Sequence, residues 1–322
     1  MHTRAQQYNS AVLEILSLTA PIFILIGLGY ASVMTRLISQ EATRGMGKFI
    51  ITIALPAMII RGMANKPLAA SMDGNFLLGY GLVSIILYAL GMLFYLHVRH
   101  APLSDASMAG LGMSSANTGF IGASICAMVL GTEPASRGVA MTILVESTLV
   151  IPLAVAIADA GATLGEVRLF RRLLITLKGL MRSPLLIAIV IGLFLSAFQV
   201  PLRGVPLQVI DMLAMTAAPV ALFSVGGNLY GLRPRGMLAD ASIISGVKLI
   251  VHPALTALVF LLLPGLSPEM RQAGILFASA PMLSIFPILG MRYGLENHCS
   301  ATLLLGTVAS FVTISATIAL IT

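Results

Sequence analysis

Three ionisable residues lie deep inside long apolar stretches of the sequence, where a charged side chain is costly. Glu146 lies near the middle of stretch 135–158, and Lys248 and His252 lie one helical turn apart in stretch 241–263. Ionisable groups at such depths typically face a polar cavity or take part in proton or ion handling. A buried carboxylic acid favours its neutral form, so the sequence predicts that Glu146 binds and releases a proton, with Lys248 and His252 as coupling partners.

Each of these residues also has a structural interpretation. Glu146 could be a structural acid that pairs with a neighbouring helix, and Lys248 could extend its amine to the nearby cytoplasmic surface. His252 could bind the carbonyl groups that Pro253 leaves without a donor. The sequence alone leaves both interpretations open.

A second group of residues interrupts two other apolar stretches. Small, hydrogen-bonding residues gather at the centre of stretch 106–130, and two prolines do so in stretch 272–292. Proline removes a backbone donor and clashes with the preceding turn, so we expect the second helix to open at 277–280. Irregular backbone at this depth is tolerated where it is buried in protein or lines a wet cavity. The residues expected to bind substrate there are Ser115, Asn117, Thr118, Gly119, Ala280, Pro281, Met282 and Ser284.

The two interruptions together favour an anion. The second half of each broken helix is expected to begin near Thr118 and near Met282. Two halves that run in opposite directions would both point positive N-terminal ends at the middle of the membrane, and free N–H groups there suit a carboxylate. Small residues and prolines also serve close helix packing and kinks without any ligand, which is the structural interpretation of either stretch alone.

The chain repeats itself at a fixed offset of 163 residues. Each copy carries five long apolar stretches, an odd number, so the second copy must be inverted in the membrane relative to the first. Two inverted copies with one broken helix each are typical of secondary transporters with a mid-membrane site. The shift lays Pro21 on Pro184, Gly29 on Gly192, Pro56 on Pro219 and Gly131 on Gly294.

Composition requires an integral membrane protein. Of 322 residues, 58% are hydrophobic and 10% are charged, and the mean hydropathy is +0.98. No cleaved leader is indicated, and Cys126 and Cys299 support neither a disulfide framework nor a metal site. Runs of about 20 apolar residues can each cross a bilayer as a helix. We expect ten spans, at 12–34, 47–64, 74–98, 106–130, 135–158, 184–200, 208–230, 241–263, 272–292 and 300–321.

The basic residues predict the orientation. Twelve Lys and Arg residues lie in or beside the loops that follow odd-numbered spans, against five on the other side. Short basic loops stay in the cytoplasm, so both termini should face outward. The connection 159–183 reads as a basic amphipathic helix on the inner leaflet, either a linker between repeats or a lipid-sensing element. The expected interfacial anchors are Tyr80, Tyr95, Tyr230, Glu14, Arg61 and Asp211.

The chain resembles bacterial members of the auxin efflux carrier family over essentially its whole length. The resemblance rests on PIFILIGLGY in the first span, LPA in the second, NTGFIG in the fourth, KLIVHP in the eighth, and ASAPM with RYG in the ninth. That family is related in fold to the bile-acid:sodium symporters. The resemblance implies an all-α membrane protein of ten helices in two inverted five-helix repeats, 1–163 and 164–322, with crossing broken helices four and nine.

The resemblance also implies a division of labour between the spans. The first two spans of each repeat, 12–64 and 184–230, would form a scaffold. The last three, 74–158 and 241–321, would form a transport bundle whose crossing half-helices hold an organic anion. Alternating access by an elevator-like movement and a homodimer through the scaffold helices are further implications.

Individual positions both match and depart from the family's pattern. Asn117 and the backbone at Thr118 and Gly119 match the first crossing, and Pro281 matches the second. Glu146 falls where relatives often carry glutamine. Three departures stand beside these matches. Ser124 falls where many relatives carry proline, and Ile285 falls where asparagine is common. The interrupted part of the ninth span lacks the acid expected of a sodium site like that of the bile-acid symporters.

These features favour a secondary transporter of a small organic anion, such as a mono- or dicarboxylate like malonate, in the bacterial cytoplasmic membrane. A proton gradient acting through Glu146, or the anion's own gradient, would drive it, with no cofactor and no nucleic-acid partner. The alternatives are a sodium-coupled symporter, a channel or sensor without turnover, and a carrier of a cation or neutral solute. An enzyme is not indicated, because HExxH pairs, GxSxG elbows and paired mid-membrane aspartates are missing.

Overall fold

The computed structural model describes residues 20–64, 72–162, 182–231 and 238–321, in which helices are joined by short connections and no strand occurs. This confirms an all-α, multi-pass membrane protein, while the inverted ten-helix repeat stays a prediction. Glu14 and most of the connection 159–183 lie outside the described residues. Two apolar helices, Ala20–Met34 and Pro184–Ala197, are shorter than a span. The seven helices long and apolar enough to cross a membrane are Gln40–Met63, Gly74–His97, Leu103–Leu130, Thr132–Gly161, Gly204–Leu229, Leu238–Leu262 and Glu296–Ile321.

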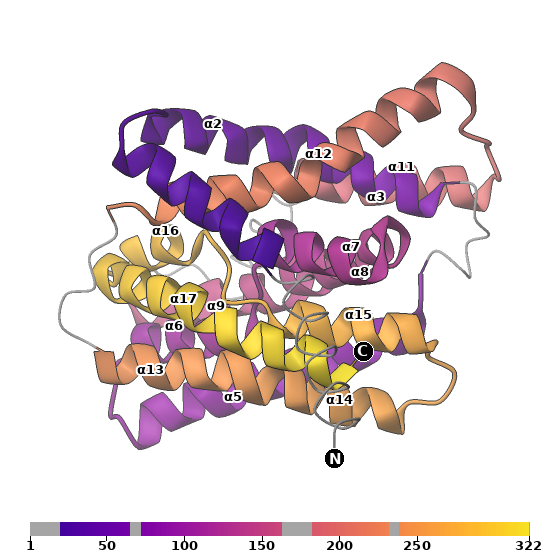
Figure 1. Ribbon diagram of the computed structural model, residues 1–322. Helices are drawn as coiled ribbons and strands as arrows, with labels where there is room; N and C mark the ends of the chain where they lie inside the picture. The colour runs from indigo at the N-terminus through magenta and orange to yellow at the C-terminus, as the bar shows by residue number, and fades with distance from the viewer. Residues whose placement is uncertain (1–19, 65–71, 163–181, 232–237, 322) are drawn as a thin grey trace, which may run out of the picture.

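One layer of the molecule runs along the top of Figure 1 and contains residues from both halves of the chain. Gly29 and Gly226 bring the helix Ala20–Met34 against its neighbour in this layer, because a Cβ on either would meet the other helix's backbone. The layer contains the helix Ala20–Met34, α2 (Gln40–Phe49), the π-helical turn η1 (Ile50–Ala54), α3 (Leu55–Met63), α11 (Pro184–Ala197) and α12 (Gly204–Leu229).

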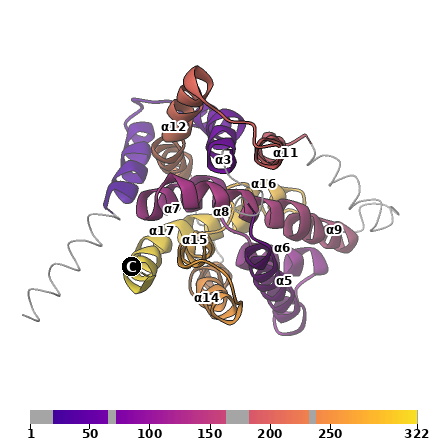
Figure 2. The same ribbon diagram turned by 90° about the vertical axis from the view of Figure 1, so that its right-hand side faces the viewer.

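The remaining helices lie below this layer, and Figure 2 shows the same division from the side. Of these, α8 (Thr132–Val145) packs against α3 and α7 (Ala123–Leu130) packs against α12 of the upper layer. The others are α5 (Gly74–His97), α6 (Leu103–Ser114), α9 (Ile151–Gly161), α13 (Leu238–Gly246), α14 (His252–Leu262), α15 (Pro268–Ser279), α16 (Phe286–Met291) and α17 (Glu296–Ile321).

Wide π-helical turns stand directly before prolines. They are η1, η3 (Glu146–Val150) and η4 (Val247–Val251), and the following helices carry Pro56, Pro152 and Pro253 as their second residues. Proline has no N–H and its ring collides with the carbonyl four residues earlier. A turn widened to five residues relieves both constraints without ending the helix. The prolines thus explain why Glu146 and Lys248 lie in widened turns.

The fourth π-helical turn, η2 (Thr118–Gly122), is followed by Ser124 at the position where the other three have proline. The Ser124 hydroxyl donates to the carbonyl of Phe120, four residues earlier, and to Ala218 of α12. The resemblance implies proline at this position. This chain has a serine there instead, whose hydroxyl connects η2 to the upper layer.

Both expected interruptions are present. The chain leaves the helix after Ser114 and resumes at Thr118, and it leaves again after Ser279. The predicted opening before Pro281 and the predicted start at Thr118 are therefore confirmed. The predicted start near Met282 is wrong, because α16 begins at Phe286 with Pro287 in its first turn. That first-turn position is the one in a helix that proline prefers.

The second span begins earlier than the sequence suggested. Its predicted start was residue 47, but α2 begins at Gln40 after the cap Ser39, whose hydroxyl oxygen accepts the Ala42 N–H at 3.1 Å. This first part is amphipathic, so its polar residues resemble a loop in the sequence. Its polar face carries Arg44 and Lys48.

Two landmarks of the repeat share a local geometry. Gly131 and Gly294 follow the two interrupted helices and adopt φ values of 92° and 76°. Side chains rarely tolerate this region, so glycine is required at both turns.

Candidate functional site

The two interruptions meet in the interior. The Asn117 N–H donates to the Pro281 carbonyl at 2.7 Å, and the Asn117 side-chain amide donates to the Ser284 hydroxyl at 2.7 Å. Three of the predicted substrate residues are thus brought into contact from positions far apart in the chain. Asn117 is 4% exposed and joins the interruptions through both its backbone and its side chain.

Glu146 holds the first interruption. One carboxylate oxygen accepts the Ala116 N–H at 2.7 Å, and the other accepts the Thr118 hydroxyl at 3.0 Å. The Tyr80 hydroxyl donates to the first oxygen at 3.5 Å. Tyr80 is fully buried, so its expected role as an interfacial anchor is wrong. Glu146 is likewise buried, and its carboxylate takes the place of the missing helical acceptors for the broken backbone.

Lys248 holds the second interruption. Its amine donates to the Ala278 carbonyl at 2.6 Å and lies 2.9 Å from Nδ1 of His252, and Lys248 and His252 have no exposed surface. Ala278 lies in the last turn of α15, where unpaired carbonyls carry partial negative charge. The interpretation that Lys248 extends to the membrane surface is therefore wrong. His252 uses Nδ1 for this amine rather than for the carbonyls near Pro253.

A buried polar network spans the two interruptions. The rings of Tyr80 and His252 have centroids 5.7 Å apart, and Tyr80 reaches Glu146 while His252 reaches Lys248. Glu146 and Lys248 attract each other electrostatically without the direct contact of an ion pair. Each charge is compensated by the other and by hydrogen bonds, which a buried charge needs to be stable.

A cavity of about 420 Å³ opens beside the meeting point. Asn117, Ser284 and Ile285 line it from the interruptions, and Arg44 and Lys48 line it from one face of α2. Within the described chain, neither basic residue has an ion-pair partner, and the one acid on the wall is Glu296. The wall therefore offers two unpaired cations and an amide, groups that suit a carboxylate ligand.

The predicted substrate residues divide into two sets. Asn117 and Ser284 line the cavity, whereas Ser115, Thr118, Ala280, Pro281 and Met282 are buried behind it and Gly119 is partly buried. No side chain caps the start of η2, because the Asn117 amide bonds Ser284 instead. The start of η2 thus has no side-chain acceptor for its first N–H groups, and the residues on either side of Thr118 and Gly119, Asn117 and Phe120, line the cavity.

Sequence reasoning missed three contributors to the cavity and its surroundings. Arg44 and Lys48 stand four residues apart, a spacing that places both on one helical face. That spacing is a usable signal, but the expected span begins at residue 47 and leaves Arg44 in the preceding loop. Phe120, which also lines the cavity, carries no polar signal and is identified only by the fold.

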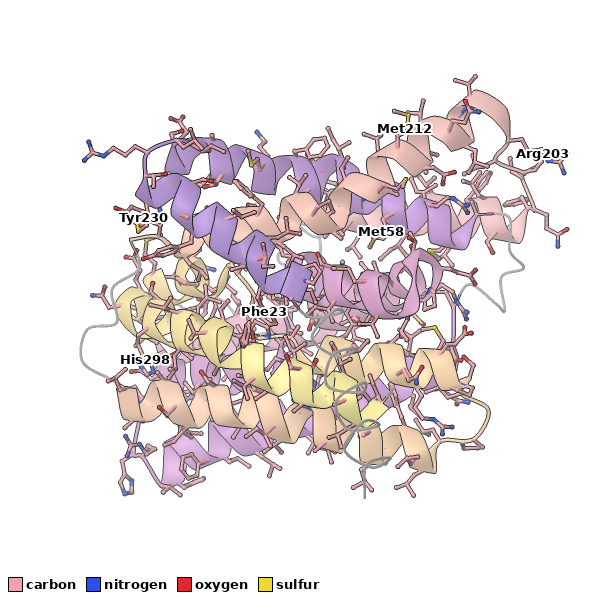
Figure 3. The ribbon with its side chains drawn as sticks, viewed as in Figure 1. Phe23, Met58, Arg203, Met212, Tyr230 and His298 are labelled. Atoms are coloured by element: carbon pink, nitrogen blue, oxygen red, sulfur yellow. The ribbon has the colours of Figure 1, made fainter. Side chains whose placement is uncertain are left out.

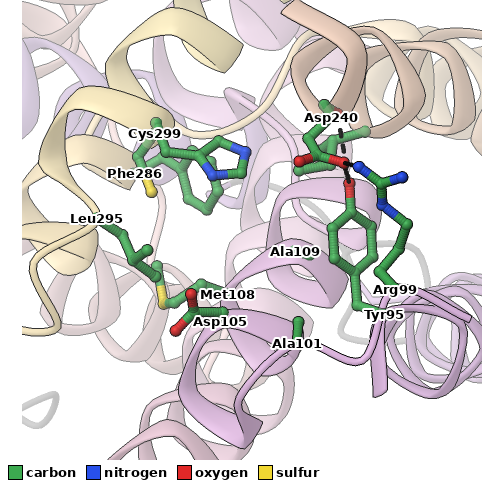
Figure 4. Close-up of a pocket in the computed structure, with 12 residues that line it drawn as sticks. Tyr95, Arg99, Ala101, Asp105, Met108, Ala109, Asp240, Phe286, Leu295 and Cys299 are labelled. Carbon is green, nitrogen blue, oxygen red and sulfur yellow. Dashed lines mark hydrogen bonds and ion pairs between the residues drawn. The ribbon is translucent and has the colours of Figure 1, made fainter. Parts of the chain in front are cut away.

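A smaller cavity of about 150 Å³ lies on the other side of α16, which contributes Phe286 to it and Pro287 and Ile288 to the first. Figure 4 shows Arg99 and Tyr95 converging on Asp240, at 2.6 Å and 3.3 Å from one carboxylate oxygen. Tyr95 is 4% exposed and ties α5 to α13, so its expected role as an interfacial anchor is wrong. Tyr230 is 36% exposed, so its role as an interfacial anchor stays a prediction.

A third cavity, of about 340 Å³, lies toward the other end of the upper layer. Figure 3 shows the two ends, with Tyr230 on the left and Arg203 and Met212 on the right. The third cavity is lined by Arg61, which forms an ion pair with Asp211 between α3 and α12. The first and third cavities thus lie at opposite ends of the helix Gln40–Met63.

The comparisons with known proteins point to membrane transport. A family model described as "Membrane transport protein" matches residues 14–318. A protein of Rhizobium meliloti named "Putative malonate transporter" is 31% identical over 321 residues, which cover 96% of each chain. An uncharacterized transporter of Methanothermobacter thermautotrophicus is 24% identical over 91% of this chain and 94% of its own. An uncharacterized transporter of Methanocaldococcus jannaschii is 25% identical over 85% of this chain and 88% of its own.

The family match covers nearly the whole chain, including both interruptions and all three buried ionisable residues. The resemblance to bacterial auxin efflux carriers is thereby confirmed, and the protein is a transmembrane transporter rather than an enzyme. The chain belongs to the membrane transport protein family, that of the auxin efflux carriers.

Proposed function

We propose that this protein is a secondary transporter that carries a small organic carboxylate across the bacterial cytoplasmic membrane by alternating access. The observation that carries the proposal is the contact of Asn117 with Pro281 and Ser284 at a cavity with two unpaired cations. A carboxylate in that cavity would meet the Asn117 amide and the first N–H groups of η2. Arg44 and Lys48 would supply the compensating charge.

The proposal includes two inverted repeats, 1–163 and 164–322, with the interrupted helices crossing at the site. Residues 20–63 and 184–229 form the upper layer, which supports a scaffold made from the first two spans of each repeat. The cavities at both ends of Gln40–Met63 lie where an elevator-like movement would open a path on each side. The basic bias supports an orientation in which the Arg44 and Lys48 end faces the cytoplasm and both termini face outward. Dimerisation through the scaffold is part of the same proposal.

Malonate is the first substrate to test. The relative from Rhizobium meliloti carries that name, and a dianion matches the two cations on α2. A cavity of about 420 Å³ also leaves room for solvent around so small a molecule. Mono- and dicarboxylates of similar length are the matched comparison.

Proton coupling through Glu146 is the finer part of the proposal. Protonation would remove the charge that attracts Lys248 and would weaken the acceptors for Ala116 and Thr118. The first interruption would then be free to shift relative to the second. Glu146→Gln mimics the protonated form, so it should transport with a flattened pH dependence. If Glu146→Gln transported with the same pH dependence as the wild type, Glu146 would not be the proton-coupling residue.

Proteoliposomes test the function directly. Vesicles loaded with unlabelled malonate should accumulate labelled malonate by counterflow, which requires a carrier and is not expected of a channel. Asn117→Ala should abolish counterflow. Asn297→Ala, which alters an exposed asparagine outside the cavity wall, is the matched control. Absence of counterflow for every carboxylate tested would refute the proposal.

A further inference from the structure

We infer that the Lys248 ammonium group is a counter-cation built into the transport site, which performs the role of a bound inorganic cation and makes anion binding independent of Na⁺. The inference rests on the proposed function and deepens it, because it decides between coupling modes of the same site. It concerns a residue that lies behind the cavity rather than on its wall.

The geometry around the amine is that of a cation site. The end of a half-helix exposes carbonyl groups without intrahelical partners, and transporters use such carbonyls and nearby carboxylates to hold Na⁺. Here the Lys248 amine donates to the Ala278 carbonyl at 2.6 Å, one residue before the end of α15. The amine therefore occupies the place next to the carbonyl that a free cation would need.

The charges around the amine are balanced. The Glu146 carboxylate, which binds the first interruption, attracts Lys248 without contacting it, and no acid contacts the amine in the described chain. The other titratable groups that face this pair are Tyr80 on α5 and His252 on α14. One carboxylate and one ammonium cancel, so a second cation would leave an uncompensated positive charge in a low-dielectric interior.

His252 fixes the amine in this position. Its Nδ1 lies 2.9 Å from the Lys248 amine and one helical turn further along the chain. A neutral imidazole nitrogen accepts from an ammonium group but adds no charge. The long lysine side chain is thus held at the Ala278 carbonyl instead of sampling other positions.

Removing the amine should turn the built-in site into a cation-binding one. Lys248→Ala leaves the Glu146 charge uncompensated beside the Ala278 carbonyl and the Tyr80 hydroxyl. Carboxylate and carbonyl oxygens are the donors that hard cations prefer. Na⁺ or Li⁺, which fit a small vacated space, should therefore stabilise this variant, while large organic cations should not.

The test compares four purified proteins in matched NaCl, LiCl, KCl and choline chloride. They are the wild type, Lys248→Ala, the double variant Glu146→Gln with Lys248→Met, and Lys48→Ala. The first readout is the thermal unfolding midpoint without substrate, and the second is the Kd for malonate. Lys48→Ala is the matched lysine control, because it removes a cation from the cavity wall and not from the interruption.

The wild type should show the same midpoint and Kd in all four salts. Lys248→Ala in choline chloride should unfold roughly 10 °C lower, as expected for an uncompensated buried charge, and NaCl or LiCl should restore part of the loss. The double variant carries neither charge and should be indifferent to the salt. Lys48→Ala should bind malonate more weakly without any cation dependence.

Several outcomes would overturn the inference. Wild-type binding that is about tenfold tighter in NaCl than in choline chloride would show that a free cation is required. A folded Lys248→Ala variant with equal stability in all salts would show that the ammonium charge is not needed. If Lys248→Ala fails to fold, the double variant provides the test. Should the double variant also fail to fold in every salt, the loss of folding would come from the missing side chains and not from an uncompensated charge, which would contradict the inference. The midpoint needs no ligand, so failure of malonate binding would count against the proposed function alone.

Discussion

The two interruptions differ in how they are enclosed. The first, residues 115–117, is three residues long and buried except where Asn117, 4% exposed, reaches the cavity wall, and the Glu146 carboxylate accepts its Ala116 N–H. The second covers residues 280–285, and its end reaches the cavity, where Ser284 is partly exposed and Ile285 is 43% exposed. The first is therefore a fixed part of the site, and the second is the side on which the site can adapt to a ligand.

The charges that hold the two interruptions differ in sign, and each matches the backbone it meets. Glu146 accepts a free N–H from Ala116, whereas Lys248 donates to the free carbonyl of Ala278. A broken helix exposes both kinds of group, and neither can be left unpaired inside a membrane. The difference explains why one acid and one base occupy helices that are otherwise apolar.

Loss of the acid at the first interruption should have the largest effect. Glu146→Ala leaves the Ala116 N–H unpaired and Lys248 uncompensated, which should cost about 3–5 kcal/mol of unfolding free energy. Thermal unfolding in detergent measures this cost. Glu146→Gln keeps the shape and one acceptor and should lose less. Equal stability of Glu146→Ala and the wild type would mean that the carboxylate does not hold the interruption.

Loss of the residue that joins the interruptions should come next. Asn117→Ala removes the side-chain link to Ser284 and an amide donor on the cavity wall. A hydrogen bond to a charged ligand is worth about 1.5–3 kcal/mol, so the malonate Kd should rise about tenfold or more. Equilibrium binding to Asn117→Ala and to the control Asn297→Ala provides the measurement. Equal malonate Kd values for Asn117→Ala and Asn297→Ala would show that Asn117 does not bind the ligand.

The cations on α2 should contribute less, because they are exposed. Arg44→Gln and Lys48→Met should each raise the malonate Kd by a few-fold, with a smaller effect on a monocarboxylate of the same length. Raising the ionic strength should reduce the difference from the wild type, since salt screens exposed charges. Titrations with both ligands at low and high salt test this. Equal losses for both ligands would argue against a contact with the second carboxylate.

The smallest effect is expected at the adaptable interruption. Ser284→Ala removes one neutral hydrogen bond, worth about 0.5–1.5 kcal/mol, and should weaken binding by a few-fold. In an Asn117→Ala background the same change should have almost no effect, because its partner is already absent. Ser242→Ala, an exposed hydroxyl that bonds within its own helix, is the control. Additive losses in the double variant would place the two residues in separate sites.

The sequence revealed local features of this site better than its long-range contacts. Pro281 located the second opening because a proline acts on its own helix, and Glu146 and Lys248 stood out because charges are rare in apolar stretches. The partners of these charges, Ala116 and Ala278, could not be predicted, since both are backbone groups that distant packing brings close. The start of α16 was missed because a second proline, Pro287, sets it.

For the amphipathic helix α2, the sequence predicted the side of the membrane but not the cavity. Arg44 and Lys48 contributed to the predicted orientation of the chain, but their place on the cavity wall depends on how α2 packs beside α12 and α17. Composition can assign such residues to a side of the membrane. Only the fold shows that they share a cavity with Asn117.

The most direct test of the central claim is the alkylation rate of Ser284→Cys in oriented membrane vesicles. The native cysteines, Cys126 and Cys299, are buried, so the new thiol should dominate the reaction with a charged reagent. If the interruptions form the carboxylate site, the thiol should react from the cytoplasmic side, and saturating malonate should slow the reaction while a neutral analogue does not. Reaction at the same rate with and without every carboxylate tested would contradict the account.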